Sequence, residues 1–442
     1  MDKETIIKEK DRYHEAEGTP FDSAVCPGCG CLCEDIDLTL KENQVIQTFH
    51  ACAWGLSKFH LGHRFLRETK HAKLIFPSRK EPSGKSLPIS YEDGFNEAAS
   101  ILCQAKRTVF FGLCQMTFEA QILSVSLIRH LQATVYPSEG MLLTPFFQAL
   151  KTQSAGTATL EEVRQLATTL VFWGANPLHS CPRLPSRYAV FVSGINAPER
   201  HISRKAFYVD PYENDTGAFA QHIPVPPEKE QEFIDNLTEI FEEGAFTLPK
   251  ELEVLTQAIE ASPFVALFVG RGIAYADSPS ERMKALFRLR EAINKKTPCV
   301  LLPVISDFNA MGFYLALQQA GIDPTDATRI RGDLRSYRPE EGDALVCLGS
   351  DPFWFFGEEQ TAAISALNLP VVAISSFQNQ TTHAADLVLP VALTGVEAEG
   401  LAFRLDGIPI YLRRILPTAQ PTDTTVLQAL TKRITGEFPC PK

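Results

Sequence analysis

Short apolar segments alternate with helical segments along this 442-residue chain, and this alternation constrains the fold more than any other feature. The apolar segments are rich in Val, Leu, Ile and Phe and lie at 108–112, 169–174, 206–210, 264–270, 299–302, 344–349 and 371–375. Strands of this kind, joined through helices, form parallel sheets that are covered on both faces. We expect an α/β protein with two doubly wound parallel-sheet halves at 90–225 and 255–390. A Pro- and Glu-rich linker with a surface helix spans 224–248.

Composition excludes several classes of function. With 45% hydrophobic residues the chain can bury a large core, and its net charge of −11 leaves no basic stripe for a phosphate backbone. No apolar segment approaches the length that crosses a bilayer, and no signal peptide is visible. We therefore expect a cytoplasmic protein with reduced cysteines, without nucleic-acid or membrane partners. Residues 1–20 are highly charged and predict an N-terminal arm.

Four cysteines near the N-terminus have the spacing of metal ligands. Cys26, Cys29 and Cys33 share one glycine-bearing loop and Cys52 follows later, while Cys31 is spare. Close thiolates on one loop, completed by a distant one, are typical of iron–sulfur sites. A zinc site usually adds a second close pair, which is missing here, although a zinc site and an unfilled loop both stay open. We expect a small cysteine domain at 21–68, with a half-buried strand at 36–40.

An internal repeat marks the ends of two strands. Trp-Gly-Ala-Asn-Pro at 173–177 corresponds to Leu-Gly-Ser-Asp-Pro at 348–352, and each is followed later by Thr and, eight residues on, Pro. Glycines at the carboxyl ends of parallel strands let the backbone approach a nucleotide, so two crevices suggest a ligand with two nucleotide-like ends. Turn chemistry alone also explains these residue types. The candidate cofactor-binding residues are Gly174, Asn176, Asp210, Gly349, Asp351 and Thr382.

A family resemblance rests on the cysteine loop and on motifs at 51–59, 119–121, 173–177, 209–211, 350–352, 397–404 and 406–410. From residue 26 to the C-terminal region, the chain resembles the B subunit of formylmethanofuran dehydrogenase, in the molybdopterin oxidoreductase superfamily. The resemblance implies that Cys26, Cys29, Cys33 and Cys52 ligate a [4Fe-4S] cluster. It also implies that the two crevices correspond to sites for the nucleotide ends of a bis-pterin tungsten or molybdenum cofactor. We expect a β-rich cap at 391–442.

One segment departs from the family pattern. Family dehydrogenases carry a cysteine or selenocysteine metal ligand, then histidine and glycine, where residues 137–147 of this chain contain neither Cys nor His. Tungsten or molybdenum needs a soft donor, and oxidation of a C–H bond needs a base. Leu142, Leu143 and Thr144 supply neither, and Cys114 is interpreted as a small buried hydrophobe. We predict no catalytic residue and no bis-pterin cofactor in this chain.

The retained scaffold and the missing ligand together predict a structural role. The chain resembles the B subunit of the bacterial formyltransferase/hydrolase complex, which implies sister subunits as partners in one-carbon metabolism linked to tetrahydromethanopterin. In that complex other subunits transfer the formyl group and hydrolyse it to formate. Two alternatives stay open: a working tungsten or molybdenum dehydrogenase subunit with an atypical ligand, and a zinc-stabilised binding module. His179 and Cys181 are interpreted as ordinary loop residues, and the aromatic segment 353–356 as core packing, a channel plug or a subunit contact.

Overall fold

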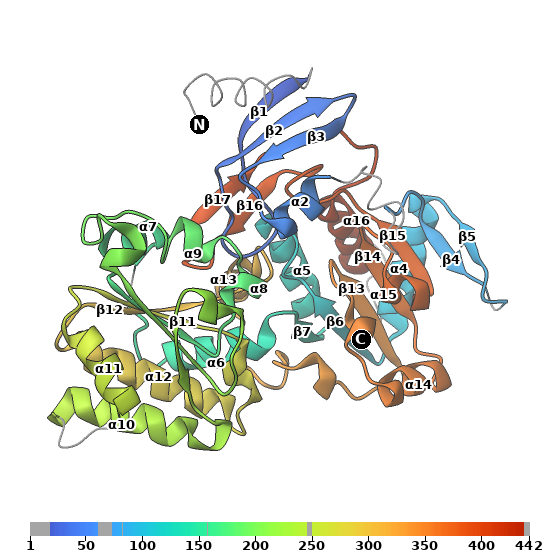
Figure 1. The fold of residues 1–442 in the computed structure, drawn as a ribbon. Coiled ribbons are helices and arrows are strands. Elements are labelled where there is room, and N and C mark those ends of the chain that lie inside the picture. Colours follow the sequence, from blue (N-terminus) through green and yellow to red (C-terminus); the bar gives the residue numbers. More distant parts are fainter. Residues whose placement is uncertain (1–17, 61–72, 82, 157, 245–249, 437–442) are drawn as a thin grey trace.

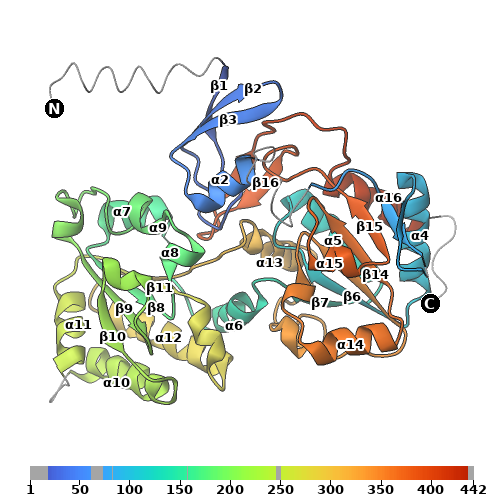
Figure 2. The same cartoon turned by 45° about the vertical axis from the view of Figure 1, so that its right-hand side comes forward.

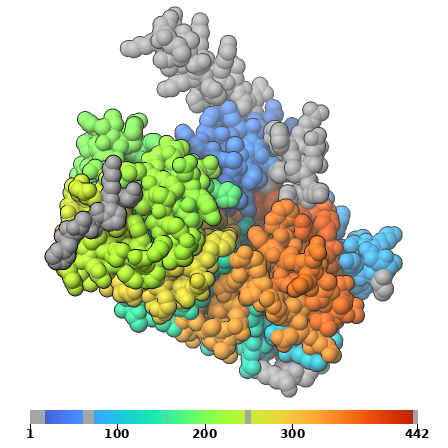
Figure 3. Space-filling model, turned by 60° about the horizontal axis from the view of Figure 1, so that its bottom comes forward, coloured from blue at the N-terminus to red at the C-terminus, as the bar shows by residue number. Residues whose placement is uncertain are grey.

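The computed structural model describes residues 18–60, 73–81, 83–156, 158–244 and 250–436. Within these residues the strands form two large sheets, a three-stranded sheet and a two-stranded hairpin (Figure 1). Figure 2 shows the two large sheets side by side, with the small N-terminal sheet above them. In the space-filling view of Figure 3 the green-to-yellow and orange parts of the chain form adjoining lobes. Only residues 18–20 of the predicted arm at 1–20 lie within the described part.

The first large sheet is parallel throughout, in the order β10-β9-β8-β11-β12. Its central strands are apolar on both faces because helices cover them, and every residue of β8, β11 and β12 is buried. Helices α10 and α12 pack against each other, and α12 also contacts β12 of this sheet. The elements are β8 (Thr169–Trp173), β9 (Lys205–Asp210), β10 (Gln221–Pro224), α10 (Glu230–Glu243), α11 (Lys250–Glu260), β11 (Val265–Val269), α12 (Pro279–Asn294) and β12 (Cys299–Pro303).

The second large sheet has the order β5-β4-β15-β14-β13-β6-β7, with β4 and β5 antiparallel at one edge. Its core is again apolar on both faces, since all of β13, β14 and β15 is buried. The elements are β4 (Ser78–Lys80), β5 (Ser86–Pro88), α4 (Tyr91–Gln104), β6 (Arg107–Gly112), α5 (Phe118–His130), β7 (Thr134–Pro137), α13 (Ala310–Gln319), β13 (Asp343–Leu348), α14 (Glu358–Ala366), β14 (Val371–Ser375), α15 (Gln380–Ala384) and β15 (Leu387–Pro390).

The two sheets divide the chain differently from the halves predicted at 90–225 and 255–390. Strands β6 and β7 belong to the second sheet. The next five strands, β8 to β12, form the whole first sheet, and β13 belongs to the second sheet again. Strand β13 pairs with β6, and Asp343 accepts two hydrogen bonds from Arg107 at 2.6 and 2.7 Å. Every buried strand has the same continuous apolar pattern, so this pattern does not reveal which sheet a strand joins.

The predicted repeat corresponds to equivalent strands in the two sheets. The run β8-β9-β10 in one sheet matches β13-β14-β15 in the other, and each run ends in a short parallel strand that contains the repeated proline. In the same comparison β11 and β12 match β6 and β7. The sheets are therefore two copies of one five-stranded arrangement, with the chain entering the second copy at a different strand.

The N-terminal and C-terminal segments meet above the two sheets (Figure 1). Strands β1 (Thr19–Ala24), β2 (Ile36–Lys41) and β3 (Gln44–Phe49) form an antiparallel sheet, and α2 (Ala53–Phe59) follows. The C-terminal segment holds the hairpin of β16 (Gly400–Phe403) and β17 (Pro409–Leu412), and then α16 (Asp423–Thr435), a helix in place of the β-rich end of the predicted cap. No helix in the described part of the chain is both long and apolar enough to cross a membrane.

Candidate functional site

The cysteine loop, residues 26–33, connects β1 to β2 and is held by backbone hydrogen bonds. The Cys26 N–H donates to the Cys33 carbonyl at 2.8 Å and closes the loop. Gly30 fixes the loop to the rest of the molecule, because its N–H donates to the Ile305 carbonyl at 3.0 Å and its carbonyl accepts from the Leu405 N–H at 2.9 Å. A Cβ at Gly30 would lie 2.9 Å from that Ile305 oxygen, so only glycine fits.

The four cysteines predicted to hold an iron–sulfur cluster gather around this loop. Cys26, Cys29 and Cys33 are buried, and Cys52, at the N-cap of α2, is half-buried. Helix α2 comes so close that a Cβ at Gly55 would lie 3.0 Å from the Cys26 Sγ. Burial raises the pKa of Cys26, and the charges of the other three thiols raise it further. The four thiols thus lie near one another, and this donor set fits an iron–sulfur cluster.

Two arginines lie beside the cysteine loop. Arg183 donates two hydrogen bonds to Asp35, each at 2.6 Å, and Arg187 also pairs with Asp35. Burial raises the pKa of Cys33 to about 12, whereas the charges of both arginines lower it. Nearby cations favour thiolates, which are the form that binds metal.

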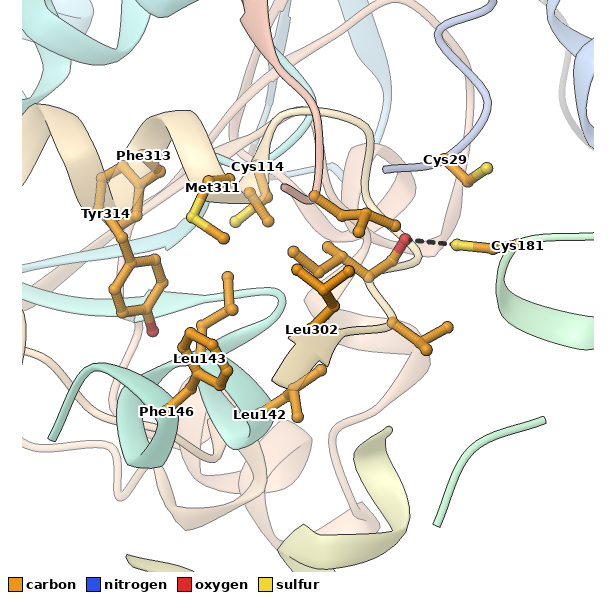
Figure 4. Close-up of a cluster of buried hydrophobic side chains, with 14 of the residues drawn as sticks. Cys29, Cys114, Leu142, Leu143, Phe146, Cys181, Leu302, Met311, Phe313 and Tyr314 are labelled. Atoms are coloured by element: carbon orange, nitrogen blue, oxygen red, sulfur yellow. Dashed lines mark hydrogen bonds between the residues drawn. The ribbon is translucent and has the colours of Figure 1, made fainter. Parts of the chain in front are cut away.

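The structure adds Cys181 to this region, although its sequence context indicates an ordinary loop residue. The Sγ atoms of Cys29, Cys31 and Cys181 all lie within 4.8 Å of one another, and within the described ranges no other trio of potential metal ligands lies so close. The Cys181 thiol donates to the Ile305 carbonyl at 3.1 Å (Figure 4). His179 does not join the group, since its ring contacts Trp54 at 6.4 Å between centroids.

The predicted cofactor-binding residues lie at the carboxyl edges of the two sheets, in two separate groups. Gly174 and Gly349 occupy equivalent turns with nearly the same left-handed φ, 54° and 57°. Asn176 accepts a hydrogen bond from the His179 N–H at 3.3 Å, and Asp351 accepts one from the Thr381 N–H at 2.8 Å. These hydrogen bonds stabilise the local turns, which is what we expect if Asn176 and Asp351 serve only to form the turns. A role in cofactor binding stays a prediction.

The surroundings of the two turns differ. Gly349 and Asp351 line a cavity of about 240 Å³, together with Lys58 and Asp423. At Gly174 the segment after β11 packs closely against the turn, and a Cβ on Gly174 would lie 3.0 Å from the Gly272 Cα. The remaining two predicted residues make local bonds: the Asp210 carboxylate accepts from the Tyr212 N–H at 3.1 Å, and the Thr382 N–H donates to Asn379 at 2.8 Å.

The segment that lacks the family metal ligand forms helix α6 (Gly140–Leu150) between the two sheets. Leu142 and Leu143 are fully buried, and Figure 4 shows them among other apolar side chains of the core. The Thr144 hydroxyl forms a hydrogen bond with the Tyr314 hydroxyl at 2.7 Å, and the Tyr314 ring stacks on Phe147. Apolar packing therefore fills this part of the molecule.

Polar groups that sequence reasoning missed lie just before α6. The Glu139 carboxylate is fully buried, accepts from Arg271 at 3.0 Å, and accepts from the backbone N–H groups of Ser306 and Asp307 at 2.7 and 3.0 Å. Burial raises the pKa of Glu139, and the Arg271 charge opposes that rise. Cys114 lies nearby, and burial, aided by the charge of Asp307, raises its pKa strongly. Glu139 lies two residues after the end of β7, and ligands of parallel sheets bind near such carboxyl ends of strands.

The chain has a molybdopterin oxidoreductase-like fold, which it shares with two solved structures. Acetylene hydratase from Pelobacter acetylenicus shares the fold with a TM-score of 0.67 and 12% identity, over 94% of this chain and 69% of that one. A chain in the formyltransferase/hydrolase complex from Methylorubrum extorquens, solved with methylofuran, has a TM-score of 0.63 and 16% identity, over 81% of this chain and 98% of that one. No protein-family model matches the chain.

Two relatives are similar in sequence to almost the whole chain. The B subunit of the tungsten-containing formylmethanofuran dehydrogenase 2 from Methanocaldococcus jannaschii is 28% identical over 93% of this chain and 98% of its own length. Its counterpart from Methanococcus maripaludis is 28% identical over 94% of this chain and 98% of its own. The resemblance to the B subunit of formylmethanofuran dehydrogenase that the sequence motifs predict is thereby confirmed.

Proposed function

We propose that this protein is the B-type subunit of a formylmethanofuran dehydrogenase-like complex in one-carbon metabolism, and that it serves as a structural scaffold without redox turnover of its own. It would hold a [4Fe-4S] cluster on Cys26, Cys29, Cys33 and Cys52. It would lack the tungsten centre that the names of its sequence relatives announce.

The observation that carries the proposal is the chemistry at the end of β7. The resembling dehydrogenases carry a cysteine or selenocysteine metal ligand in this segment, but here Ser138 and Glu139 follow the strand and apolar Leu142 and Leu143 lie in α6. Both leucines are fully buried and contribute to the core. Glu139 already accepts three hydrogen bonds, one from Arg271 and two from backbone N–H groups, which fix its carboxylate in place.

Exposed aromatic side chains support a role in assembly. In the aromatic segment 353–356, Phe356 is buried and packs against Phe111 at 5.4 Å between ring centroids. Its neighbours Trp354 and Phe355 are 66% and 52% exposed. Aromatic side chains that lie next to each other on a surface are typical anchors of protein interfaces. We infer that a sister subunit of the complex binds over Trp354 and Phe355.

A second candidate is a working dehydrogenase subunit with an atypical ligand, and Cys114 is the observation that favours it. Its thiol lies close enough to Glu139 and Asp307 for their charges to raise its pKa. That neighbourhood would offer one soft donor and one carboxylate base. The burial that raises the pKa of Cys114 opposes this candidate, because the neutral thiol is a poor ligand.

The test is the activity of the complex purified under anaerobic conditions with this subunit in place. We expect no formate oxidation with a viologen acceptor, while the complex still contains the subunit after gel filtration. Formate oxidation that is lost in Cys114→Ser and kept in Cys299→Ser, a buried cysteine of β12, would establish the second candidate instead.

A further inference from the structure

The cysteine trio of Cys29, Cys31 and Cys181 is not explained by the iron–sulfur site. Its Sγ atoms lie within 4.8 Å of one another, and all three side chains are buried. Two of the thiols flank Gly30 in the cysteine loop, whereas Cys181 comes from the C-cap of helix α8 (Pro177–Ser180), 150 residues further along the chain than Cys31. Three thiols from two distant segments converge on one point.

We propose that the cysteine trio binds a single thiophilic metal ion of the Zn²⁺ or Cu⁺ class. This site goes beyond the proposed function and competes with the iron–sulfur cluster, because both need Cys29. The ion would bind to the cysteine trio before the iron–sulfur cluster is assembled, and assembly of the cluster would release the ion.

The spacing of the sulfur atoms matches a single ion. A Zn–S bond of about 2.3 Å places two sulfurs of a tetrahedral site about 3.8 Å apart. The three Sγ atoms lie within 4.8 Å of one another, so the sulfur–sulfur distances need to shorten by no more than about 1 Å to reach this spacing. Cys26, Cys33 and Cys52 form no such close group among the described residues, as expected for donors arranged around a larger cluster.

One carbonyl oxygen holds the trio together. The Ile305 oxygen accepts from the Gly30 N–H at 3.0 Å and from the Cys181 thiol at 3.1 Å, so it fixes the loop and the distant cysteine at once. When a metal ion binds, Cys181 gives up its proton and this hydrogen bond, but the Gly30 bond remains and keeps the loop in place. Metal binding therefore releases protons without dismantling the loop.

Charges near the trio suit an anionic metal site. Three thiolates around a divalent ion leave one net negative charge, and around a monovalent ion they leave two. Arg183 lies two residues beyond Cys181, and its side chain is only 19% exposed; that of Arg187 is 12% exposed. Both guanidinium groups are anchored on Asp35 at the edge of the cysteine loop. Partly buried cations of this kind stabilise thiolates.

The experiment uses the full chain, produced without iron, reduced, and titrated with Co²⁺ under anaerobic conditions. We expect one Co²⁺ per chain with a thiolate-to-cobalt charge-transfer band. Cys181→Ser and Cys31→Ser should each weaken Co²⁺ binding at least tenfold, whereas Cys26→Ser and the control Cys347→Ser should leave it unchanged. A band that survives in Cys181→Ser, or one that disappears in Cys26→Ser, would overturn the proposal, as would an unresponsive wild-type protein.

Two further measurements separate this site from the cluster and from misfolding. Reconstitution with iron and sulfide should displace Co²⁺ from the wild-type protein, and the iron–sulfur cluster should still form in Cys181→Ser. X-ray absorption of the wild-type protein loaded with Zn²⁺ should find three sulfur ligands at about 2.3 Å. Four sulfur ligands would place the ion at the cluster cysteines and contradict the proposal, whether or not the variants fold.

Discussion

The carboxyl group of Asp423 should make the stability of this protein depend on pH. Asp423 begins helix α16, is 3% exposed, and lines the cavity beside Gly349. Its carboxyl accepts from the Thr424 N–H at 2.8 Å and from the Thr394 hydroxyl at 3.3 Å. Burial nevertheless raises its pKa from 3.8 to about 6. The replacement Asp423→Asn keeps one of the two acceptor oxygens and removes the ionisable group.

The direction and size of the effect follow from this pKa. As the pH rises above 3.8, the carboxyl of the unfolded chain ionises first, while the folded protein keeps its proton until about pH 6. The wild-type protein therefore loses stability through this window, by about 1.6 kcal/mol at pH 5 and about 3 kcal/mol at pH 7. The Asn variant has no such loss.

Urea unfolding of the wild-type protein and of Asp423→Asn at about pH 5 and about pH 7 provides the assay. The free energy of unfolding of the variant, relative to the wild type, should grow by about 1.3 kcal/mol between the two pH values. The exposed Asp215 supplies a control, and Asp215→Asn should show no such growth. A relative stability of Asp423→Asn that is the same at both pH values would refute the reasoning.

Three more predictions concern the cluster, the interface and the duplicated turns. Cys26→Ser should abolish the visible absorption and the paramagnetic signal of the reduced [4Fe-4S] cluster, whereas a retained cluster would contradict the assigned ligands. Trp354→Ala should weaken binding to the sister subunit by about 2 kcal/mol, or roughly 30-fold in Kd by calorimetry, without changing the thermal unfolding of the free chain; an unchanged Kd would exclude this surface. Gly349→Ala should lower the free energy of unfolding by about 1 kcal/mol because Gly349 has a positive φ. Gly174→Ala should lower it by about 2 to 3 kcal/mol, because the new Cβ would also meet Gly272. Equal losses for the two variants in urea unfolding would contradict the packing described.

Local pattern predicts the central buried strands but not their pairing. Strands β11 (Val265–Val269) and β14 (Val371–Ser375) lie where the apolar segments of the sequence place them, whereas the short strand β7 (Thr134–Pro137) is not among those segments. The assignment of β6 and β7 to the same sheet as β13 depends on contacts more than 200 residues apart, such as the Arg107–Asp343 pair. Such contacts leave no periodic signal in the sequence, and consecutive strands were therefore grouped in one half.

The candidate site shows the same division. The spacing of Cys26, Cys29, Cys33 and Cys52 predicts that their thiols lie close together, and the structure places them near one another; their role as cluster ligands stays a prediction. The sequence gives no sign that Cys181 lies near Cys29, because the two cysteines are brought together by tertiary structure that no local motif records. Residues that act through tertiary contacts are in general invisible to pattern alone.

Metal analysis of the complex, purified under anaerobic conditions, tests the central claim most directly. The scaffold account predicts about four iron ions per chain of this subunit, from the [4Fe-4S] cluster, and neither tungsten nor molybdenum above trace level. Tungsten or molybdenum at about one equivalent per chain, lost when the subunit is removed from the complex, would contradict the account and establish a working redox centre.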